Sequence, residues 1–153
     1  MILSTHFITG AALASFSDSV VILFCSALIL HFVLDAIPHW EYLDEFDEIK
    51  QKWPLVAIDI LLGPSLILFS IVGLYGFDWL KIWPFLFSGA VSVLPDGLSF
   101  LHFMLPQNRL LEKVFVFHEF VHNKKNLSFK QGFLFQIVIN LVFLLAIFLL
   151  PKG

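Results

Sequence analysis

The sequence predicts an all-α, polytopic membrane protein: a helical bundle with four to five membrane-embedded helices and one amphipathic interfacial helix, in a single integral-membrane domain over residues 1–153. Composition is the first reason, because 59% of the 153 residues are hydrophobic and only 14% are charged. The mean hydropathy of +0.90 lies far outside the range of soluble domains. Pattern is the second reason, because the apolar residues form long runs separated by short polar segments. No polar stretch is long enough to fold alone.

The first two predicted helices form a tight hairpin. Residues 5–16 suit a short helix, and the segment before it lacks the basic region of a signal peptide, so we expect this helix to be retained. Ser17 and Asp18 suit a turn, with Asp18 as the helix N-cap. Residues 19–37 then suit a second helix that ends near Pro38.

A hydrophilic loop and a long third helix follow the hairpin. Residues 39–52 are polar and aromatic, and they form the only extended hydrophilic loop before the next apolar run. The third helix is predicted from Pro54, a good first-turn residue, to Tyr75. Pro64 is expected to kink this helix.

The three remaining segments differ in character. Residues 79–105 are apolar but contain Pro84 and the sequence LPDG at 94–97, which predicts a broken or re-entrant end. Residues 108–123 have the periodicity of an amphipathic interfacial helix. Its predicted apolar stripe consists of Leu110, Val114, Phe117 and Val121. Residues 132–150 form a final apolar span without acidic or histidine residues, for which we predict a structural role.

Charged residues orient the bundle and limit its partners. Most basic residues fall in two loops on one predicted side: Lys50, Lys52, Arg109, Lys113, Lys124, Lys125 and Lys130. Lys81 and Lys152 lie opposite, so the positive-inside rule predicts that the two basic loops face the cytoplasm. The net charge of -3 arises mostly from the acidic cluster Glu41, Asp44, Glu45, Asp47 and Glu48. That cluster argues against nucleic acid as a partner and leaves membrane lipids as the expected partners.

Ionisable side chains within the apolar runs are the strongest indication of function, because they are costly in a bilayer. His31 and Asp35 lie four residues apart on one predicted helix, and so do His118 and His122, which brings each pair close enough to share a cation. In the predicted topology all candidate ligands fall at the cytoplasmic face. The candidate metal ligands are His6, His31, Asp35, His39, Asp59, Asp96, His118 and His122. They exceed the three or four ligands that one zinc ion takes, so we predict one or two divalent ions, with zinc preferred over Mn or Fe.

Residues 118–122 also spell HEFVH, which matches the H-E-x-x-H motif of zinc proteases. In that motif two histidines hold zinc and the glutamate acts as the general base, so Glu119 is the candidate catalytic residue. Residues 123–153 contain no Asp, Glu, His or Cys. Any further ligand must therefore come from upstream.

Several candidates also have a structural interpretation. His31 and Asp35 can hydrogen-bond to each other and lock two helices together, and His6 can be an interfacial residue near the chain end. His102, in the sequence SFLHFML, is either a core histidine bonded to a carbonyl or a group that supports a ligand. Asp59 stands alone in VAIDILLG and would be expensive in lipid unless paired, so a ligand role is favoured for it.

Three phrases carry a resemblance to a known family: STHFITGA, HFVLDAIPHW and VLPDG, within residues 4–122. They resemble those of small bacterial membrane proteins related to the LexA-binding, inner-membrane-associated family of metal-dependent hydrolases. In that family a TH-x3-G opening, a PD pair, a histidine-rich loop and an H-x3-D helix supply the metal site. The resemblance implies His6, Asp96, His31 and Asp35 as ligands and the bacterial cytoplasmic membrane as the location.

The first functional hypothesis is a membrane-embedded, metal-dependent hydrolase that acts at the cytoplasmic face on a phosphoester or other ester of a lipid-linked substrate. Two alternatives use the same residues differently: a metal-ion carrier or channel, and an intramembrane zinc protease built on HEFVH. A further alternative is a non-catalytic membrane scaffold whose histidines are structural.

Overall fold

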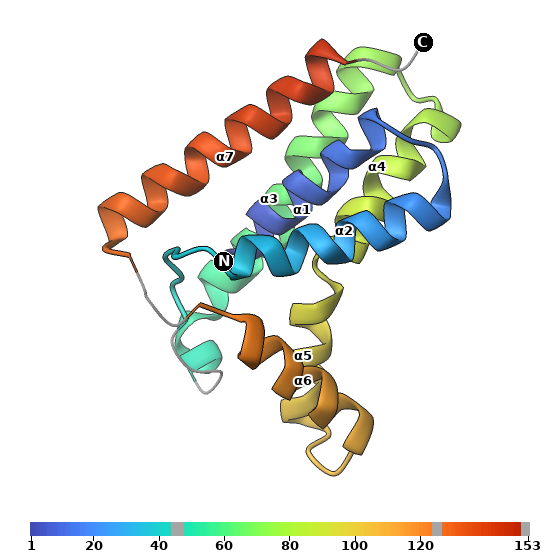
Figure 1. Ribbon diagram of the computed structural model, residues 1–153. Helices are drawn as coiled ribbons and strands as arrows, with labels where there is room; N and C mark the ends of the chain where they lie inside the picture. Colours follow the sequence, from blue (N-terminus) through green and yellow to red (C-terminus); the bar gives the residue numbers. More distant parts are fainter. Residues whose placement is uncertain (44–47, 124–126, 151–153) are drawn as a thin grey trace.

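The computed structural model describes residues 1–43, 48–123 and 127–150. Within these residues the chain is helical and has no strand, which confirms the all-α prediction (Figure 1). The helices are α1 (Leu3–Ala12), η1 (Leu13–Ser15), α2 (Val20–Asp35), α3 (Ile49–Tyr75), α4 (Trp79–Ser92), α5 (Leu94–Met104), α6 (Arg109–Val121) and α7 (Phe129–Leu149). Part of the predicted acidic loop, residues 44–47, lies outside the described residues, and so do Lys124, Lys125 and Lys152.

Fewer helices than predicted are long enough to cross a membrane. Among the described residues, α3 with 27 residues and α7 with 21 are sufficiently long and apolar, and the bent pair α4 and α5 counts as a third span if its two parts are taken together. The prediction of four to five membrane-embedded helices is therefore corrected to two or three candidate spans. Helices α1 and α2 have 10 and 16 residues. At 1.5 Å per residue they reach about 15 Å and about 24 Å, short of a hydrocarbon core of roughly 30 Å.

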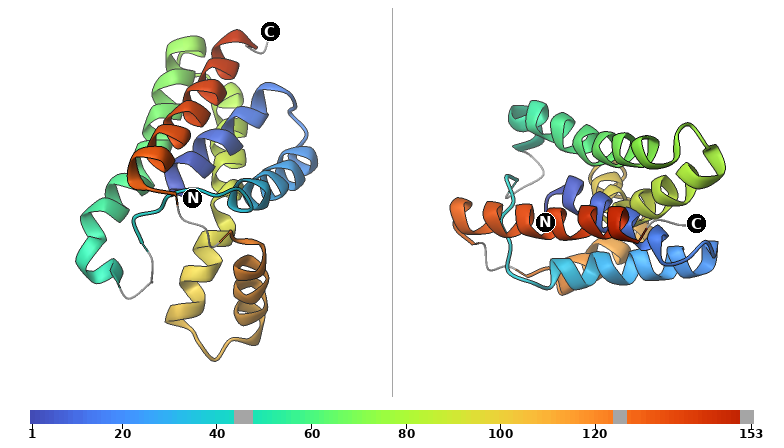
Figure 2. Two further views of the ribbon diagram at one scale, coloured as in Figure 1. Left: turned by 60° about the vertical axis from the view of Figure 1, so that its left-hand side comes forward. Right: turned by 90° about the horizontal axis from the view of Figure 1, so that it is seen from above.

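The short helix α1 lies at the centre of the bundle, packed against α2, α3, α4 and α7 (Figures 1 and 2). Every residue of α1 from Ser4 to Ala12 is buried. Small residues permit this packing, since a Cβ added to Gly10 would lie 2.3 Å from the Cβ of Ser92. Around the C-terminal part of α1 the core is apolar. It includes Ile8, Ala11, Leu23, Ile67, Ile71, Phe85 and Ile147.

The predicted hairpin of α1 and α2 is present, but its turn differs in detail. The N-cap of α2 is Ser19, whose hydroxyl accepts a hydrogen bond from the Ile22 N–H at 3.5 Å. Asp18 was predicted as this cap and lies one residue too early. Helix α2 ends at Asp35, three residues before Pro38. A helical backbone is disfavoured for the residue that precedes a proline, so helices usually end at or before that residue.

The prolines of α3 and α4 lie inside these helices. Helix α3 begins at Ile49, so Pro54, which was predicted to start it, lies within it, and Pro84 lies inside α4. The break predicted at the LPDG sequence is present, because α4 and α5 meet there at a bend of 48°. Pro95 is tolerated there because it occupies the first turn of α5.

Helices α5 and α6 pack together as a hairpin that extends beyond the end of the bundle where α1 begins (Figures 1 and 2). Asn108 caps α6, and its side chain accepts hydrogen bonds from Leu110 N and Leu111 N. The buried residues of α6 are Leu111 and His118. Two members of the predicted apolar stripe, Leu110 and Phe117, are 71% and 52% exposed, so they do not pack into the bundle.

Candidate metal centre

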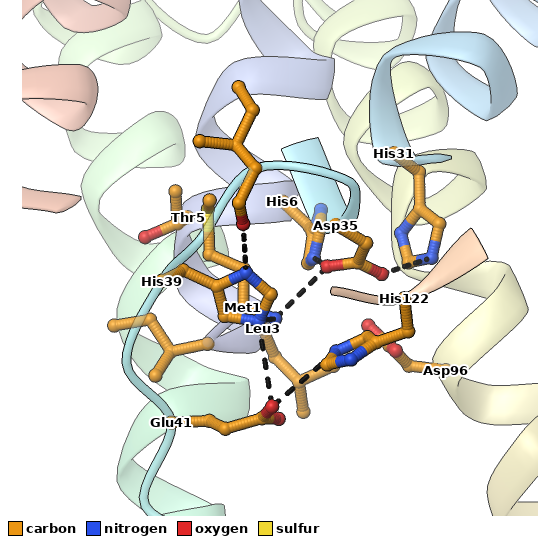
Figure 3. Close-up of polar contacts among 12 residues, drawn as sticks. Met1, Leu3, Thr5, His6, His31, Asp35, His39, Glu41, Asp96 and His122 are labelled. Carbon is orange, nitrogen blue, oxygen red and sulfur yellow. Dashed lines mark hydrogen bonds and ion pairs between the residues drawn. The ribbon is translucent and has the colours of Figure 1, made fainter. Parts of the chain in front are cut away.

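Asp35 is the centre of a buried polar cluster at the end of α2 (Figure 3). Its Oδ1 atom lies 3.0 Å from His6 Nε2 on α1. Its Oδ2 atom lies 3.1 Å from His31 Nε2, one turn earlier on α2, and 2.9 Å from His118 Nε2 on α6. One carboxylate thus faces three imidazoles that are far apart in the sequence.

Four residues form what we call the first cluster: His31, Asp35, Asp96 and His118, each offering one ligand atom within 4.8 Å of the others. The Nε2 atoms of His31 and His118 are 3.2 Å apart. Ligand atoms held tetrahedrally around a zinc ion lie about 3.3 Å apart, given metal–nitrogen bonds of about 2.0 to 2.1 Å. The spacing of these nitrogens and of Asp35 Oδ2 therefore fits a shared divalent ion.

Asp96 completes the first cluster from the first turn of α5. Its Oδ1 atom lies 3.6 Å from His118 Nε2. Its Oδ2 atom is buried and has no hydrogen-bond partner among the described residues. A buried carboxylate oxygen without a partner is costly, and a cation would satisfy it.

Hydrogen bonds behind His118 set the orientation of its ring. Ser99 Oγ lies 2.8 Å from His118 Nδ1, which leaves Nε2 directed at Asp35. Such a partner on the far nitrogen is typical of metal-binding histidines. Burial lowers the pKa of His118, but the hydrogen bond to Asp35 and the negative charge of Asp96 outweigh burial and hold this pKa above its ordinary value.

A second cluster shares Asp35 and adds His39 and His122. Glu41 flanks it, with Oε1 3.5 Å from His39 Nε2 and 3.4 Å from His122 Nε2. The terminal nitrogen of Met1 also lies here, 2.7 Å from His39 Nε2 and 3.0 Å from Asp35 Oδ1. Figure 3 shows these side chains converging on one region.

Electrostatics in the second cluster favour the protonation forms that bind metals. Burial raises the pKa of Glu41, but the contact with His39 and the charge of the Met1 amine outweigh burial, so its pKa lies below the ordinary value. Burial lowers the pKa of His122, and the Met1 amine lowers it further. Glu41 is thereby favoured as a carboxylate and His122 as a neutral imidazole.

Six of the eight predicted ligands therefore lie in the two clusters, and two do not. His6 contacts Asp35 and stacks near His31, with ring centroids 4.2 Å apart, but belongs to neither group. Asp59 instead caps α1: its oxygens accept hydrogen bonds from Leu3 N at 2.8 Å and Ser4 N at 2.9 Å, and from the Tyr42 hydroxyl at 3.1 Å. The acceptor role explains how this carboxylate is accommodated in an apolar helix.

The HEFVH motif is divided between the two clusters. His118 lies in the last turn of α6, whereas His122 is the C-cap residue and has an extended backbone, with ψ at 127°. The two rings are 5.8 Å apart at an angle of 85°. This arrangement differs from the single zinc-binding face that the motif predicts for one continuous helix. Glu119, the candidate base, is exposed on α6 and lines the adjoining cavity.

A cavity of about 630 Å³ opens beside both clusters. Its polar lining residues include Glu41, Asp59, Asp96, His118, Glu119 and His122. Its apolar lining residues include Leu43, Ile49, Val56, Ile60, Val93 and Phe100. Its volume lies within the usual range for small-molecule sites, roughly 300 to 1,000 Å³.

Sequence reasoning missed several residues that build this site. Glu41 was interpreted as part of a solvated loop, although it stands two residues after His39 in an extended segment, where alternate side chains point to the same side. Ser99 follows Asp96 by three residues on α5, which places both on one face. Gln136 of α7 is buried, and it accepts from Ile2 N and donates to the Trp40 carbonyl. These hydrogen bonds agree with the structural role predicted for α7, although Gln136 itself was not singled out.

His102 lies apart from both clusters, stacked on Phe115 with ring centroids 5.0 Å apart. It therefore serves as a matched control histidine in the experiments below.

Fold and site together define an all-α protein with membrane-like apolar helices and a buried His/Asp cluster suited to a metal ion. Comparisons of the chain with family models, with curated proteins and with solved structures give no match.

Proposed function

We propose that this protein is a membrane-embedded, metal-dependent hydrolase that cleaves a phosphoester or other ester of a lipid-linked substrate at the cytoplasmic face of a bacterial membrane. The single observation that carries the proposal is the first cluster. Its four potential ligands come from three helices, are largely buried, and adjoin a cavity lined by both polar and apolar side chains. This is the expected environment for a reaction at the end of a lipid chain.

The ligand set suits zinc best, with Mn or Fe as alternatives, because it combines imidazoles with carboxylates. When bound, such an ion supplies an activated water at neutral pH and polarises the oxygen of the bond that is cleaved. Ser99 keeps the His118 ring directed at the ion. Glu119, on the cavity wall, is assigned the role of general base.

The mixed lining of the cavity supports an amphipathic substrate. Val56 and Ile60 of α3 and Phe100 of α5 line it together with Asp96 and His118. An acyl or prenyl chain would contact the apolar side chains while its ester lies beside the ligands. A soluble sugar would leave the apolar side chains without a partner.

The cytoplasmic orientation rests on the distribution of charge. The start of α3 and the α5–α6 hairpin, with their basic residues, lie at the same end of the molecule as the site (Figure 2). The turn between α3 and α4, followed by Lys81, lies at the other end. The positive-inside rule favours the cytoplasm for the end that holds the site.

Two alternatives receive less support. An ion carrier needs ligands along the depth of the membrane. In the described part of the chain the buried ionisable residues instead gather around the start of α1: His6, His31, Asp35, His39, Asp59 and His118. A zinc protease needs both histidines of HEFVH on one ion, but they lie in different clusters.

The test is metal analysis and hydrolysis by purified protein in lipid nanodiscs, with phosphatidic acid and p-nitrophenyl esters of phosphate and of acetate as probes. We expect bound divalent metal and turnover of at least one probe in the wild type, both lost in His31→Ala and in His118→Ala. The matched control His102→Ala should retain both. If the two cluster variants keep their metal and full activity, or if the metal-loaded wild type cleaves no probe, the proposed function is wrong.

A further inference from the structure

We infer that the site binds two divalent cations bridged by the Asp35 carboxylate, the second held by His39, His122 and Glu41. The inference rests on the proposed function and deepens it, because it narrows the substrate to a phosphoester. Its starting point is that Asp35 belongs to both clusters. Asp35 Oδ2 faces His31 and His118. Oδ1 contacts His6 Nε2 and the Met1 nitrogen, and the Met1 nitrogen in turn contacts His39 Nε2.

The tautomer of His39 is fixed by its neighbour. His39 Nδ1 lies 2.7 Å from the Ile37 carbonyl oxygen, which can only accept a hydrogen bond. In the neutral ring Nδ1 therefore carries the proton, and the lone pair of Nε2 faces the second cluster. A histidine whose far N–H donates to a backbone carbonyl is a common form of metal ligand.

Glu41 and His122 complete the second position. Glu41 Oε1 is 3.5 Å from His39 Nε2 and 3.4 Å from His122 Nε2, so one carboxylate oxygen faces both imidazoles. The rings of His39 and His122 are 4.9 Å apart. The two imidazoles, the Glu41 carboxylate and the bridging Asp35 carboxylate make a four-ligand set of the kind that zinc takes.

The space between these ligands already accommodates a cation. The Met1 ammonium nitrogen is within 3.0 Å of both Asp35 Oδ1 and His39 Nε2. The competing explanation is that this ammonium group is the only cation the second cluster holds. Metal binding at this position requires the Met1 nitrogen to move or to become a ligand itself, and the stoichiometry of binding separates the two explanations.

Charge balance indicates the kind of substrate. Among the proposed ligands alone, Asp35, Asp96 and Glu41 contribute three negative charges, against four positive charges from two divalent ions, so the two ions with their ligands carry one positive charge that would attract an anion. Two-metal sites with ions roughly 3.5 to 4 Å apart stabilise the attacking and leaving oxygens of phosphoryl transfer. In the hydrolysis a water oxygen bonds to phosphorus, the bond from phosphorus to the alcohol oxygen breaks, and the alcohol leaves with a proton from that water. No oxidant or reductant is required.

The experiment measures metal stoichiometry and magnetic coupling in full-length protein loaded with Mn²⁺ in nanodiscs. We expect two Mn²⁺ per wild-type chain and an exchange-coupled electron paramagnetic resonance spectrum. The double variant His39→Ala, His122→Ala should bind one Mn²⁺ and give the hyperfine pattern of an isolated ion. His102→Ala should keep two ions and the coupled spectrum.

Several results would overturn the inference. Saturation of the wild type at one Mn²⁺ would do so, as would two ions retained by the double variant. If the double variant loses all metal or fails to fold, Glu41→Gln provides the second test, since it keeps the size of the side chain and should weaken only the second equivalent. Hydrolysis with only one ion bound would support the proposed function and contradict the two-ion inference. Two bound ions without hydrolysis of any probe would support the two-ion site and contradict the proposed function.

Discussion

At the scale of single residues, the histidines of the site differ in how firmly their rings are held. His118 and His39 each have a partner on Nδ1, from Ser99 Oγ and from the Ile37 carbonyl. The Nδ1 atoms of His6 and His31 are buried and have no hydrogen-bond partner in the described part of the chain. The orientation of the first cluster therefore depends strongly on the contact between Ser99 and His118.

Removal of the Ser99 hydroxyl should weaken metal binding without removing a ligand. For Ser99→Ala we expect metal affinity to fall by about 10- to 100-fold, the usual effect of losing such a supporting hydrogen bond. Ser99→Thr keeps the hydroxyl and should recover most of the affinity. Competition with a fluorescent chelator measures both values. Ser26→Ala is the matched control, because Ser26 Oγ donates only to backbone carbonyls of α2; equal losses in both alanine variants would contradict a specific role for Ser99.

The sequence was sufficient to identify the candidate polar residues within the apolar runs. It was not sufficient to predict which groups each of them contacts. His31 and Asp35 were identifiable because a four-residue spacing brings side chains together on any helix. Asp59 stands equally alone in the sequence, yet its partners are backbone N–H groups at the start of α1, 56 and 55 residues away. That relationship depends on the packing of α1 against α3, which no local pattern encodes.

At the scale of elements, α1 is held in place by groups on two long helices. Asp59 of α3 accepts from the first N–H groups of α1, and Gln136 of α7 accepts from Ile2 N. Asn140 of α7 also donates to the Thr5 hydroxyl, 3.1 Å away. The position of His6 therefore depends on helices that supply no ligand themselves. The sequence predicted apolar segments at α1 and α2, but both helices are too short to span a membrane. Helix α1 is shielded by its neighbours and need not cross the bilayer.

Asp59 is expected to affect stability and not metal content. Asp59→Ala removes a carboxylate that caps the N-terminus of α1, which should lower the free energy of unfolding by about 1 to 2 kcal/mol. The expected metal content is that of the wild type. Unfolding in mixed micelles measures the first quantity, and elemental analysis of the folded fraction measures the second. Loss of metal with unchanged stability would restore the original assignment of Asp59 as a ligand.

At the scale of the whole molecule, the site, the beginning of α3 and the α5–α6 hairpin share one end, while the turn between α3 and α4 lies at the other (Figure 2). The apolar core lies between them and separates the two ends. Helices α3 and α7 expose apolar side chains such as Phe69, Leu61 and Leu141, as expected of helices that face lipid. A lipid-linked substrate could therefore approach the cavity from the side, past α3, rather than through the bundle.

The orientation of this arrangement can be tested with single cysteines in a Cys25→Ser background, since Cys25 is the only cysteine and is exposed. Phe77→Cys, in the turn between α3 and α4, and Gln107→Cys, in the turn between α5 and α6, leave the charge distribution unchanged. If the end that holds the site faces the cytoplasm, a membrane-impermeant maleimide should label Phe77→Cys in intact spheroplasts, and Gln107→Cys only after permeabilisation. The opposite pattern would place the site outside the cytoplasm and would show that the basic loops do not determine the orientation of this chain.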